Sequence, residues 1–296
     1  MRNQGYAYTS IISSRYHGQP LLAHLAALYP HSSPAAWRQK LENGEVTLNG
    51  APASGAETLA AGQTLIWNRP PWVEPAAPLH FAVLWEDDHL LAVDKPGGLP
   101  TLPGGGYLEH TLLRQVQRRT PAAHPVHRLG RATTGIVLFA KSSSAAAWLF
   151  HHWNTPQIEK VYRALAIGLA PRDHYEILTP IGLVPHPLLG SVWAASPSGK
   201  ASKSVATVLS RAAETTTFAV SLHSGRPHQI RIHLASLGHP LLGDPLYDNA
   251  GRVRADLPGL PGDGGYLLHA QHLRFPHPLT REEIRLEAPL PPAWPA

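Results

Sequence analysis

The chain has 296 residues, of which 43% are apolar and 15% are charged, and this length is enough for about two globular domains with cores of their own. The formal net charge is +5, from 25 lysines and arginines against 20 acidic residues, which favours a polyanionic partner such as RNA. The sequence has no cysteine, which excludes disulfides, thiolate ligands and cysteine nucleophiles, and no stretch of about 20 apolar residues that would cross a membrane.

Residues 15–67 are predicted to form a small α+β unit. Apolar residues recur at helical spacing in 20–29, and a second helical pattern covers 33–42. A short alternating strand follows at 45–48, a hairpin turn comes next, and 64–67 give a closing strand. Two helices followed by a small antiparallel sheet are therefore expected here.

Residues 68–79 are rich in proline and are predicted to be a stiff linker. Residues 80–296 form the second predicted unit, in which strand-like runs outnumber helical patterns. The strand-like runs are 90–93, 135–140, 161–167, 205–209, 218–222 and 267–275, and the helical patterns are 142–153 and 229–237. Because strands and helices do not alternate regularly, we expect an α+β fold with a mixed, largely antiparallel sheet and flanking helices.

Two segments carry clustered basic residues. The loop at 124–135 places Arg128 and Arg131 directly before a buried-looking strand, in a position typical of a functional loop or of a solvated basic turn. The segment 223–247 places Pro227 at an expected first helical position, so that Arg226, His228 and Arg231 gather at a helix N-terminus. Such a cluster suits a phosphate or a buried carboxylate, and it also fits an ordinary helix start.

Six motifs follow one another in the order found in one enzyme family. The chain resembles the RluA-type family of RNA pseudouridine synthases, and the resemblance covers residues 80–290. The motifs are KPGG at 95–98, HRLGRATTG at 127–135, KVYRA at 160–164, SGRPHQIRIH at 224–233, GHPLLGDPLY at 238–247 and LHAQHLRFPHP at 268–278. The first unit resembles, through GEVTLNG at 44–50, the small RNA-binding domain that many of these synthases carry.

The resemblance implies the pseudouridine synthase fold and the isomerisation of uridines in ribosomal or transfer RNA after base flipping, without metal or cofactor. The scattered histidines, which lack HExxH spacing, agree with the expected absence of a metal site. We expect a cytoplasmic monomer with no membrane partner. By resemblance, Arg128 supports the flipped base, Tyr162 stacks on it, and Arg226 pairs with the catalytic carboxylate. The expected RNA contacts are His127, Arg131, His228, Arg231, Arg38 and Lys40.

One position departs from the family pattern. Where HRLD supplies the catalytic aspartate, this chain has Gly130, which has no side chain to act as nucleophile or base. Three interpretations stay open: a synthase that uses a carboxylate from elsewhere, an inactive RNA-binding pseudoenzyme acting as a chaperone or assembly factor, and a hydrolase or glycosidase that reuses the pocket. The last has no GxSxG elbow or paired carboxylates to support it.

Overall fold

A computed structural model of the chain describes residues 2–29, 31–254, 264–292 and 294. The chain divides into two compact units, Met1–Glu74 and Pro75–Ala296, and each unit is described by itself. No helix in the described residues is long and apolar enough to cross a membrane.

The first unit packs two helices on a four-stranded sheet of order β1-β4-β2-β3. Ser33 caps the second helix by accepting a hydrogen bond from the Ala36 amide, and Pro34 follows at the first helical position. Trp37 and Leu21 are fully buried in the core beneath the helices. The elements are β1 (Tyr6–Ile11), a 3-10 turn (Ser14–Tyr16), α1 (Leu21–Leu28), α2 (Pro34–Glu42), β2 (Val46–Leu48), β3 (Ala51–Pro52) and β4 (Thr64–Arg69).

The observed limits of this unit are wider than the limits predicted from sequence. Strand β1 lies before residue 15 and pairs along its whole length with β4, which continues to Arg69. The short, polar-alternating segment at the N-terminus gave no hydrophobic periodicity, so its pairing with β4 was not predicted. The division between the units falls within the proline-rich segment 68–79.

The second unit is built on a ten-stranded mixed sheet with the path β10-β13-β14-β9-β15-β8-β6-β5, to which β16 and β7 add at β15 and β8. β8 and β15 are parallel, and the other pairs of described strands are antiparallel. A separate hairpin, β11-β12, lies beside α5. The strands are β5 (Ala82–Glu86), β6 (Leu90–Lys95), β7 (His124–Pro125), β8 (Thr134–Ala140), β9 (Glu159–Ile167), β10 (His174–Ile177), β11 (Ile181–His186), β12 (Gly190–Ala195), β13 (Ser204–Ala212), β14 (Thr215–Leu222), β15 (Leu268–Pro276) and β16 (Glu283–Glu287).

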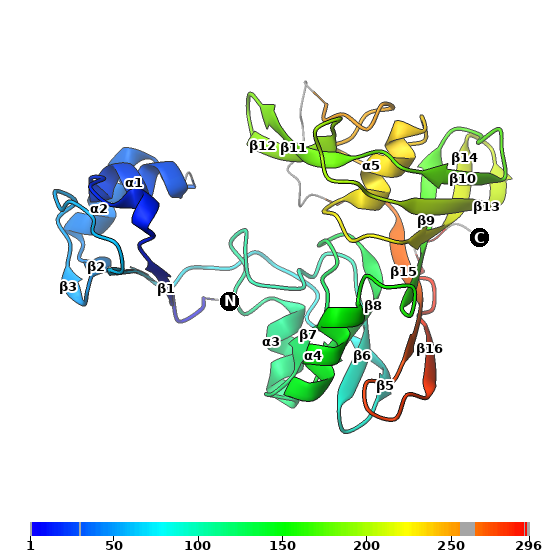
Figure 1. The fold of residues 1–296 in the computed structure, drawn as a ribbon, viewed down its shortest axis with the longest axis horizontal. Coiled ribbons are helices and arrows are strands. Elements are labelled where there is room, and N and C mark those ends of the chain that lie inside the picture. The colour runs from blue at the N-terminus through cyan, green and yellow to red at the C-terminus, as the bar shows by residue number, and fades with distance from the viewer. Residues whose placement is uncertain (1, 30, 255–263, 293, 295–296) are drawn as a thin grey trace. The chain divides into compact units, whose positions relative to one another are not determined.

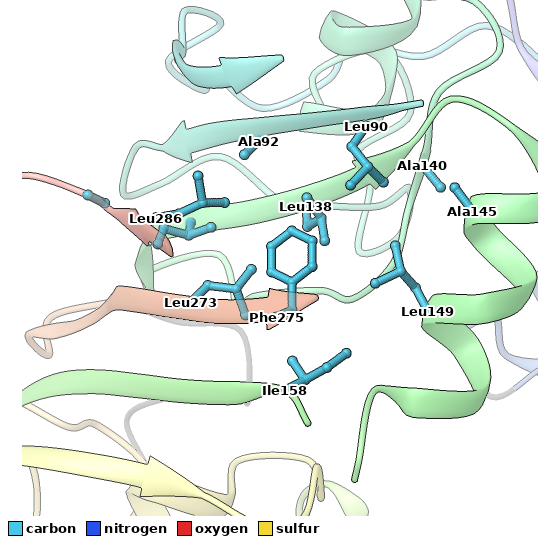
Figure 2. Packing of buried hydrophobic residues seen from close by; sticks show 12 residues of the cluster. Leu90, Ala92, Leu138, Ala140, Ala145, Leu149, Ile158, Leu273, Phe275 and Leu286 are labelled. Carbon is cyan, nitrogen blue, oxygen red and sulfur yellow. The ribbon is translucent and has the colours of Figure 1, made fainter. Parts of the chain in front are cut away.

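Two helices cover opposite faces of β6 and β8, because successive side chains of a strand point to opposite faces. Figure 2 shows Ala145 and Leu149 of α4 (Ser143–His152) against Leu90 and Leu138 on one face. On the other face, α3 (Leu112–Arg119) packs on the odd-numbered residues of β6 and β8. α3 was not predicted from the sequence, since only a few of its residues are apolar.

The third helix of this unit, α5 (Gln229–Ser236), packs on the β9, β13 and β14 part of the sheet (Figure 1). It begins at Gln229, as the 229–237 pattern predicts, but Pro227, which was expected at the first helical position, lies before the helix. The N-cap is His228, whose backbone is left-handed with φ +56°, so the chain turns sharply between Pro227 and the helix. The helix ends before Gly238, as predicted.

Gly135 is required where β8 lies beside β15. Its φ is +101°, and a Cβ atom there would lie 2.3 Å from the carbonyl oxygen of Ala270. We expect Gly135→Ala to lower the free energy of unfolding by roughly 3 kcal/mol or more, because backbone strain and a backbone clash add together. Urea unfolding measures this change.

Gly190→Ala is the matched control, because Gly190 also has a positive φ, +71°, but has nothing within 4 Å of the added Cβ. We expect it to cost about 1 kcal/mol from backbone strain alone. Equal losses in the two variants would contradict the role given to the β8–β15 contact.

Candidate active site

Tyr162 lies at the centre of the sheet face that α3 and α5 share. It stands on β9, paired with Val220 of β14 on one side and Ala270 of β15 on the other. Its ring packs against the core under α5 and against the core under α3. Burial raises the pKa of the Tyr162 hydroxyl to about 12, so the group stays protonated at neutral pH. The Tyr162 ring is thus held where the core under α3 meets the core under α5.

A buried lysine holds the loop that carries Arg128 and Gly130. Lys95 is fully buried, and its ammonium group donates to the carbonyl oxygens of Pro96, Leu99 and Arg131 at 2.8, 2.8 and 3.1 Å. The Gly98 amide donates to the same Arg131 carbonyl at 2.8 Å. Burial lowers the pKa of Lys95 to about 7, and the neighbouring Asp94 opposes this shift. The KPGG turn therefore fixes the loop through its backbone.

A second contact fixes the loop one residue before Gly130. The Thr101 hydroxyl donates to the carbonyl oxygen of Leu129 at 2.9 Å and accepts from the Leu129 amide at 3.2 Å. The Leu129 side chain is buried in the core under α3. With Leu129 and Arg131 both held, Gly130 between them has a defined place.

Gly130 lies beside an open cavity of about 390 Å³. A Cβ atom at Gly130 would lie 3.2 Å from the Tyr266 hydroxyl and 3.5 Å from the Thr133 hydroxyl, and its backbone does not have the left-handed conformation. An aspartate is therefore accommodated if the end of the Tyr266 side chain moves by a few tenths of an ångström. The cavity is lined by Gly97, Gly98, Arg131, Ala132, Gly264, Gly265, Tyr266 and Leu267.

A buried ion pair lies behind Tyr266. The Arg231 guanidinium donates to both carboxylate oxygens of Asp244 at 2.7 Å, and the two side chains are 2% and 1% exposed. The guanidinium also lies over the rings of Tyr266 and Tyr247, at 4.4 and 4.9 Å from their centroids. Asp244 accepts in addition from the Leu246 and Tyr247 amides. The predicted RNA contact of Arg231 is wrong, because its guanidinium is buried and already paired.

Arg226 does not have the carboxylate partner that the resemblance implied. Its guanidinium donates to the carbonyl oxygen of Ala201 at 3.3 Å, and no ion pair involves it within the described part of the chain. The Arg226 amide donates to the side-chain oxygen of Gln229, which also accepts from Ser224. Arg231, five residues further on, is the arginine that this fold pairs with a carboxylate.

His228 and Arg128 belong to one neighbourhood. The Nδ1 atom of His228 lies 2.6 Å from the Tyr247 hydroxyl. Burial lowers the pKa of His228 to about 3, with contributions from the charges of Arg231 and Arg128 against that of Asp244. Tyr266 joins the two segments, because its hydroxyl lies beside Gly130 and its ring lies under the Arg231 guanidinium. Arg128 itself is exposed and free to meet a ligand.

The other predicted RNA contacts lie in different settings. His127 stacks on Trp153 at 4.5 Å and its Nε2 accepts from the Leu138 amide, and burial lowers its pKa to about 3, which favours a structural role. Arg131 donates to the Tyr107 hydroxyl at 2.9 Å while it lines the cavity. Arg38 and Lys40 belong to α2 of the first unit, where Arg38 is exposed.

Asp94 and Asp244, two described carboxylates next to or within the family motifs, are held away from Gly130. Asp94 pairs with Ile136 on the α4 face of the sheet, opposite the face that carries Tyr162. Burial raises the pKa of Asp94. Asp244 is engaged by Arg231 and two amides. Asp256 and Asp263 lie outside the described residues.

Several residues of this site were not singled out from the sequence for the role they have. Tyr247, Gln229 and Lys95 lie within the family motifs without a predicted role, and Tyr266 lies outside the motifs. The signals available were the length of the HQIR and GDPLY motifs and a lysine directly after an apolar strand. Only the approach of distant segments shows that these side chains touch, because the contacts join residues more than ten positions apart.

The family profile described as RNA pseudouridylate synthase matches residues 89–236, which hold Tyr162, the 127–135 loop and the 224–233 segment. The chain is 42% identical to an uncharacterized RNA pseudouridine synthase of Synechocystis sp., over 89% of this chain and 91% of the relative. The chain belongs to the RNA pseudouridylate synthase family. It is also 37% identical to RNA pseudouridine synthase 5 of Arabidopsis thaliana, over 98% and 94%, and 30% identical to ribosomal large subunit pseudouridine synthase D of Pseudomonas aeruginosa, over 93% and 89%.

The fold agrees with this membership. The solved structure of human RNA pseudouridylate synthase domain containing 1 superposes with a TM-score of 0.56 at 24% identity, covering 73% of this chain and 86% of that protein. The α+β class and the mixed, largely antiparallel sheet predicted from the sequence are therefore confirmed. In this pseudouridine synthase fold, Tyr266 lines the cavity beside Gly130 and belongs to the core against which Tyr162 packs.

The buried ion pair gives a stability prediction. Asp244→Asn leaves the Arg231 guanidinium buried without a counter-charge, so we expect the free energy of unfolding to fall by about 3–5 kcal/mol. Urea unfolding of the purified variant measures this loss. Asp173→Asn is the control, because Asp173 pairs with Arg211 at a surface where it is 84% exposed, and its loss is expected to stay within about 1 kcal/mol. Similar values for the two variants would show that the Arg231–Asp244 pair does not hold this site together.

A buried histidine of α5 gives a pH prediction. His233 is fully buried, its Nε2 donates to the Thr179 carbonyl, and burial lowers its pKa to about 4. The unfolded chain takes up a proton below about pH 6.5 while the folded chain does not, so stability is lost as the pH falls from there towards 4. We expect His233→Gln to make this loss shallower by about 1.4 kcal/mol per pH unit. Urea unfolding at pH 7.0, 6.0 and 5.0 tests this, and parallel lines for the two proteins would refute it.

Proposed function

We propose that this protein isomerises uridine to pseudouridine in structured RNA, with ribosomal or transfer RNA as the substrate class. The observation that carries the proposal is a cavity in a member of this family whose wall includes Arg131 of the Lys95-fixed loop and Tyr266. The Arg231–Asp244 pair supports the Tyr266 ring from behind. The relative from Pseudomonas aeruginosa is named for the large ribosomal subunit, which supports ribosomal RNA as the first substrate to test.

The reaction is an isomerisation in which one glycosidic bond replaces another. The bond between C1′ of the ribose and N1 of the uracil breaks, the base rotates, and a bond from C1′ to C5 forms, while the C5 proton is replaced by one on N1. Substrate and product are isomers, so no oxidant, reductant or other co-reactant is consumed. The protein has to extract the base from its stack, hold it while it turns and move protons, and the extraction costs a few kcal/mol.

The described side chains suit the holding step. The Tyr162 ring is fixed between the cores under α3 and α5 and is only partly buried, so it serves as the stacking surface for the extracted base. The exposed Arg128 faces the segment of His228 and supports the flipped backbone through a phosphate. The Arg131 side chain lies at the cavity wall, where it meets the ribose or phosphate of the target nucleotide.

The residue at position 130 also limits which group can break the glycosidic bond. Gly130 supplies no side chain, so attack or proton removal at the sugar falls to a group other than the residue at this position. The family membership and the high coverage of the relatives favour the enzyme over the RNA-binding pseudoenzyme. The monomeric state, the cytoplasmic location and the absence of a metal stay predictions.

The test is the pseudouridine content of unmodified ribosomal and transfer RNA transcripts after incubation with the wild type and with Gly130→Asp, measured by nucleoside mass spectrometry. We expect the wild type to form pseudouridine, and Tyr162→Ala to reduce the rate by at least tenfold because the flipped base loses its stacking surface. If the wild type is active, replacing each aspartate in turn by asparagine identifies the group that opens the bond.

The backbone at position 130 accepts an aspartate, so the Gly130→Asp variant is a valid comparison. Modification by Gly130→Asp alone would mean a pocket that still binds uridine but has lost its chemistry. That outcome would replace the isomerase by the RNA-binding pseudoenzyme.

A further inference from the structure

The first unit carries aromatic and basic side chains on one face of its sheet. In the antiparallel pair β1–β4, Tyr6 lies opposite Arg69 and Tyr8 opposite Trp67, and paired residues share a face. These four side chains therefore form two neighbouring rows on the same side. The Tyr8 and Trp67 rings stack with centroids 5.2 Å apart and planes inclined by 20°, and Tyr6 meets Tyr8 edge-on at 4.8 Å.

The helices cover only part of this face. Leu65 of β4 and Val46 of β2 are buried in the core beneath α1 and α2. Trp37, a buried core residue of α2, meets Trp67 edge-on at 5.1 Å. Beyond it, Tyr6 and Tyr8 are 43% and 42% exposed. The face that carries the core thus continues past the helices as an exposed aromatic surface.

Positive charge lies beside the Trp67 ring, on which Tyr8 stacks. The Lys40 ammonium lies 5.5 Å from the Trp67 centroid, and the Arg69 guanidinium lies 3.6 Å from the Trp72 centroid and 5.8 Å from that of Trp67. His31 stacks on Trp67 at 5.4 Å, and burial together with the charges of Lys40 and Arg69 lowers its pKa. Two cations and a neutral imidazole therefore converge on one indole ring.

These charges are not neutralised by acidic neighbours. Among the described residues, no carboxylate forms an ion pair with Lys40 or Arg69, and Lys40 donates instead to the Ser32 hydroxyl. Glu45 accepts from the Trp67 indole N–H at 3.1 Å and fixes that ring. The surface is rigid, aromatic and open to an anion.

We propose that this aromatic-basic cluster, made of Tyr6, Tyr8, His31, Lys40, Trp67 and Arg69, binds an unpaired nucleotide of the RNA substrate. The base stacks on the exposed tyrosine rings and the adjoining phosphates contact Lys40 and Arg69. The inference rests on the proposed function only in that the substrate is RNA.

The chemistry of the cluster selects this occupant. A nucleotide presents a flat π surface next to a negative phosphate, and exposed rings flanked by lysine and arginine match both features at once. Stacking on an aromatic side chain does not depend on which base is present, and a base inside a duplex cannot offer its face. The cluster therefore binds single-stranded segments rather than helices, and without strong sequence preference.

The test measures binding of the full-length protein to a fluorescein-labelled oligouridylate of 12 nucleotides by fluorescence anisotropy. We expect Tyr8→Ala to weaken binding by about tenfold, and Tyr8→Phe to bind as the wild type does because it keeps the ring. Ile11→Ala is the matched control, since Ile11 is 64% exposed on the other face of the same strand, and it leaves binding unchanged. Thermal unfolding confirms that each variant is folded.

The charged side of the cluster has its own readout. We expect Arg69→Gln to weaken binding and to reduce the slope of log Kd against log salt by about 0.7, the value for one phosphate contact on a single strand. Arg15→Gln removes an equal charge from the same unit, where Arg15 also lies over a ring, that of Tyr16 at 4.4 Å. It leaves the slope unchanged.

Unchanged affinity in both Tyr8→Ala and Arg69→Gln would overturn the inference, and so would equal losses in Ile11→Ala and Arg15→Gln. Should Tyr8→Ala fail to fold, Tyr6→Ala and Arg69→Gln decide the question. This outcome is independent of catalysis. If the protein forms pseudouridine but these variants bind oligouridylate normally, the proposed function holds and the RNA-binding role of the cluster is wrong. If the variants lose binding but the protein forms no pseudouridine, the cluster holds and the proposed function is wrong.

Discussion

The arrangement of the second unit depends on the ion pair between Arg231 and Asp244, which are almost completely buried. Burying two charges is expensive, and bidentate geometry, two backbone amides on Asp244 and two aromatic rings around the guanidinium compensate for this cost. The pair ties α5 to the segment after Gly243 and places the Tyr266 ring between itself and Gly130. The wall of the cavity is thus built outward from a charge pair that substrate does not reach.

The opposite wall is held by a different device. Lys95 gathers three carbonyl oxygens from two segments, so the loop before β8 is fixed by its backbone and its side chains stay free to vary. This explains how the chain can carry glycine at position 130 and keep the loop in place. The pocket's shape depends on Lys95, Thr101 and Leu129, whereas its chemistry depends on whatever occupies or reaches the space beside Gly130.

The two units divide the work of handling RNA in this picture. In the second unit, Tyr162 lies partly buried at the junction of two cores, and the proposed function assigns it to stack on one extracted base. In the first unit, exposed tyrosines beside lysine and arginine offer a surface for unpaired nucleotides outside the reaction. Both surfaces use the same physical device, an aromatic ring whose orientation its neighbours fix before the ligand arrives.

The sequence by itself determined the α+β class, the helices of the first unit, the central strands and the family, because periodicity, capping residues and ordered motifs are local along the chain. It also showed that position 130 has no carboxylate. Only the tertiary structure decided that Arg231 rather than Arg226 holds a carboxylate, that Asp94 lies on the far face of the sheet, and that Tyr8 stacks on Trp67. These facts depend on strand register and on contacts between distant segments, and one residue of register decides which face a side chain takes.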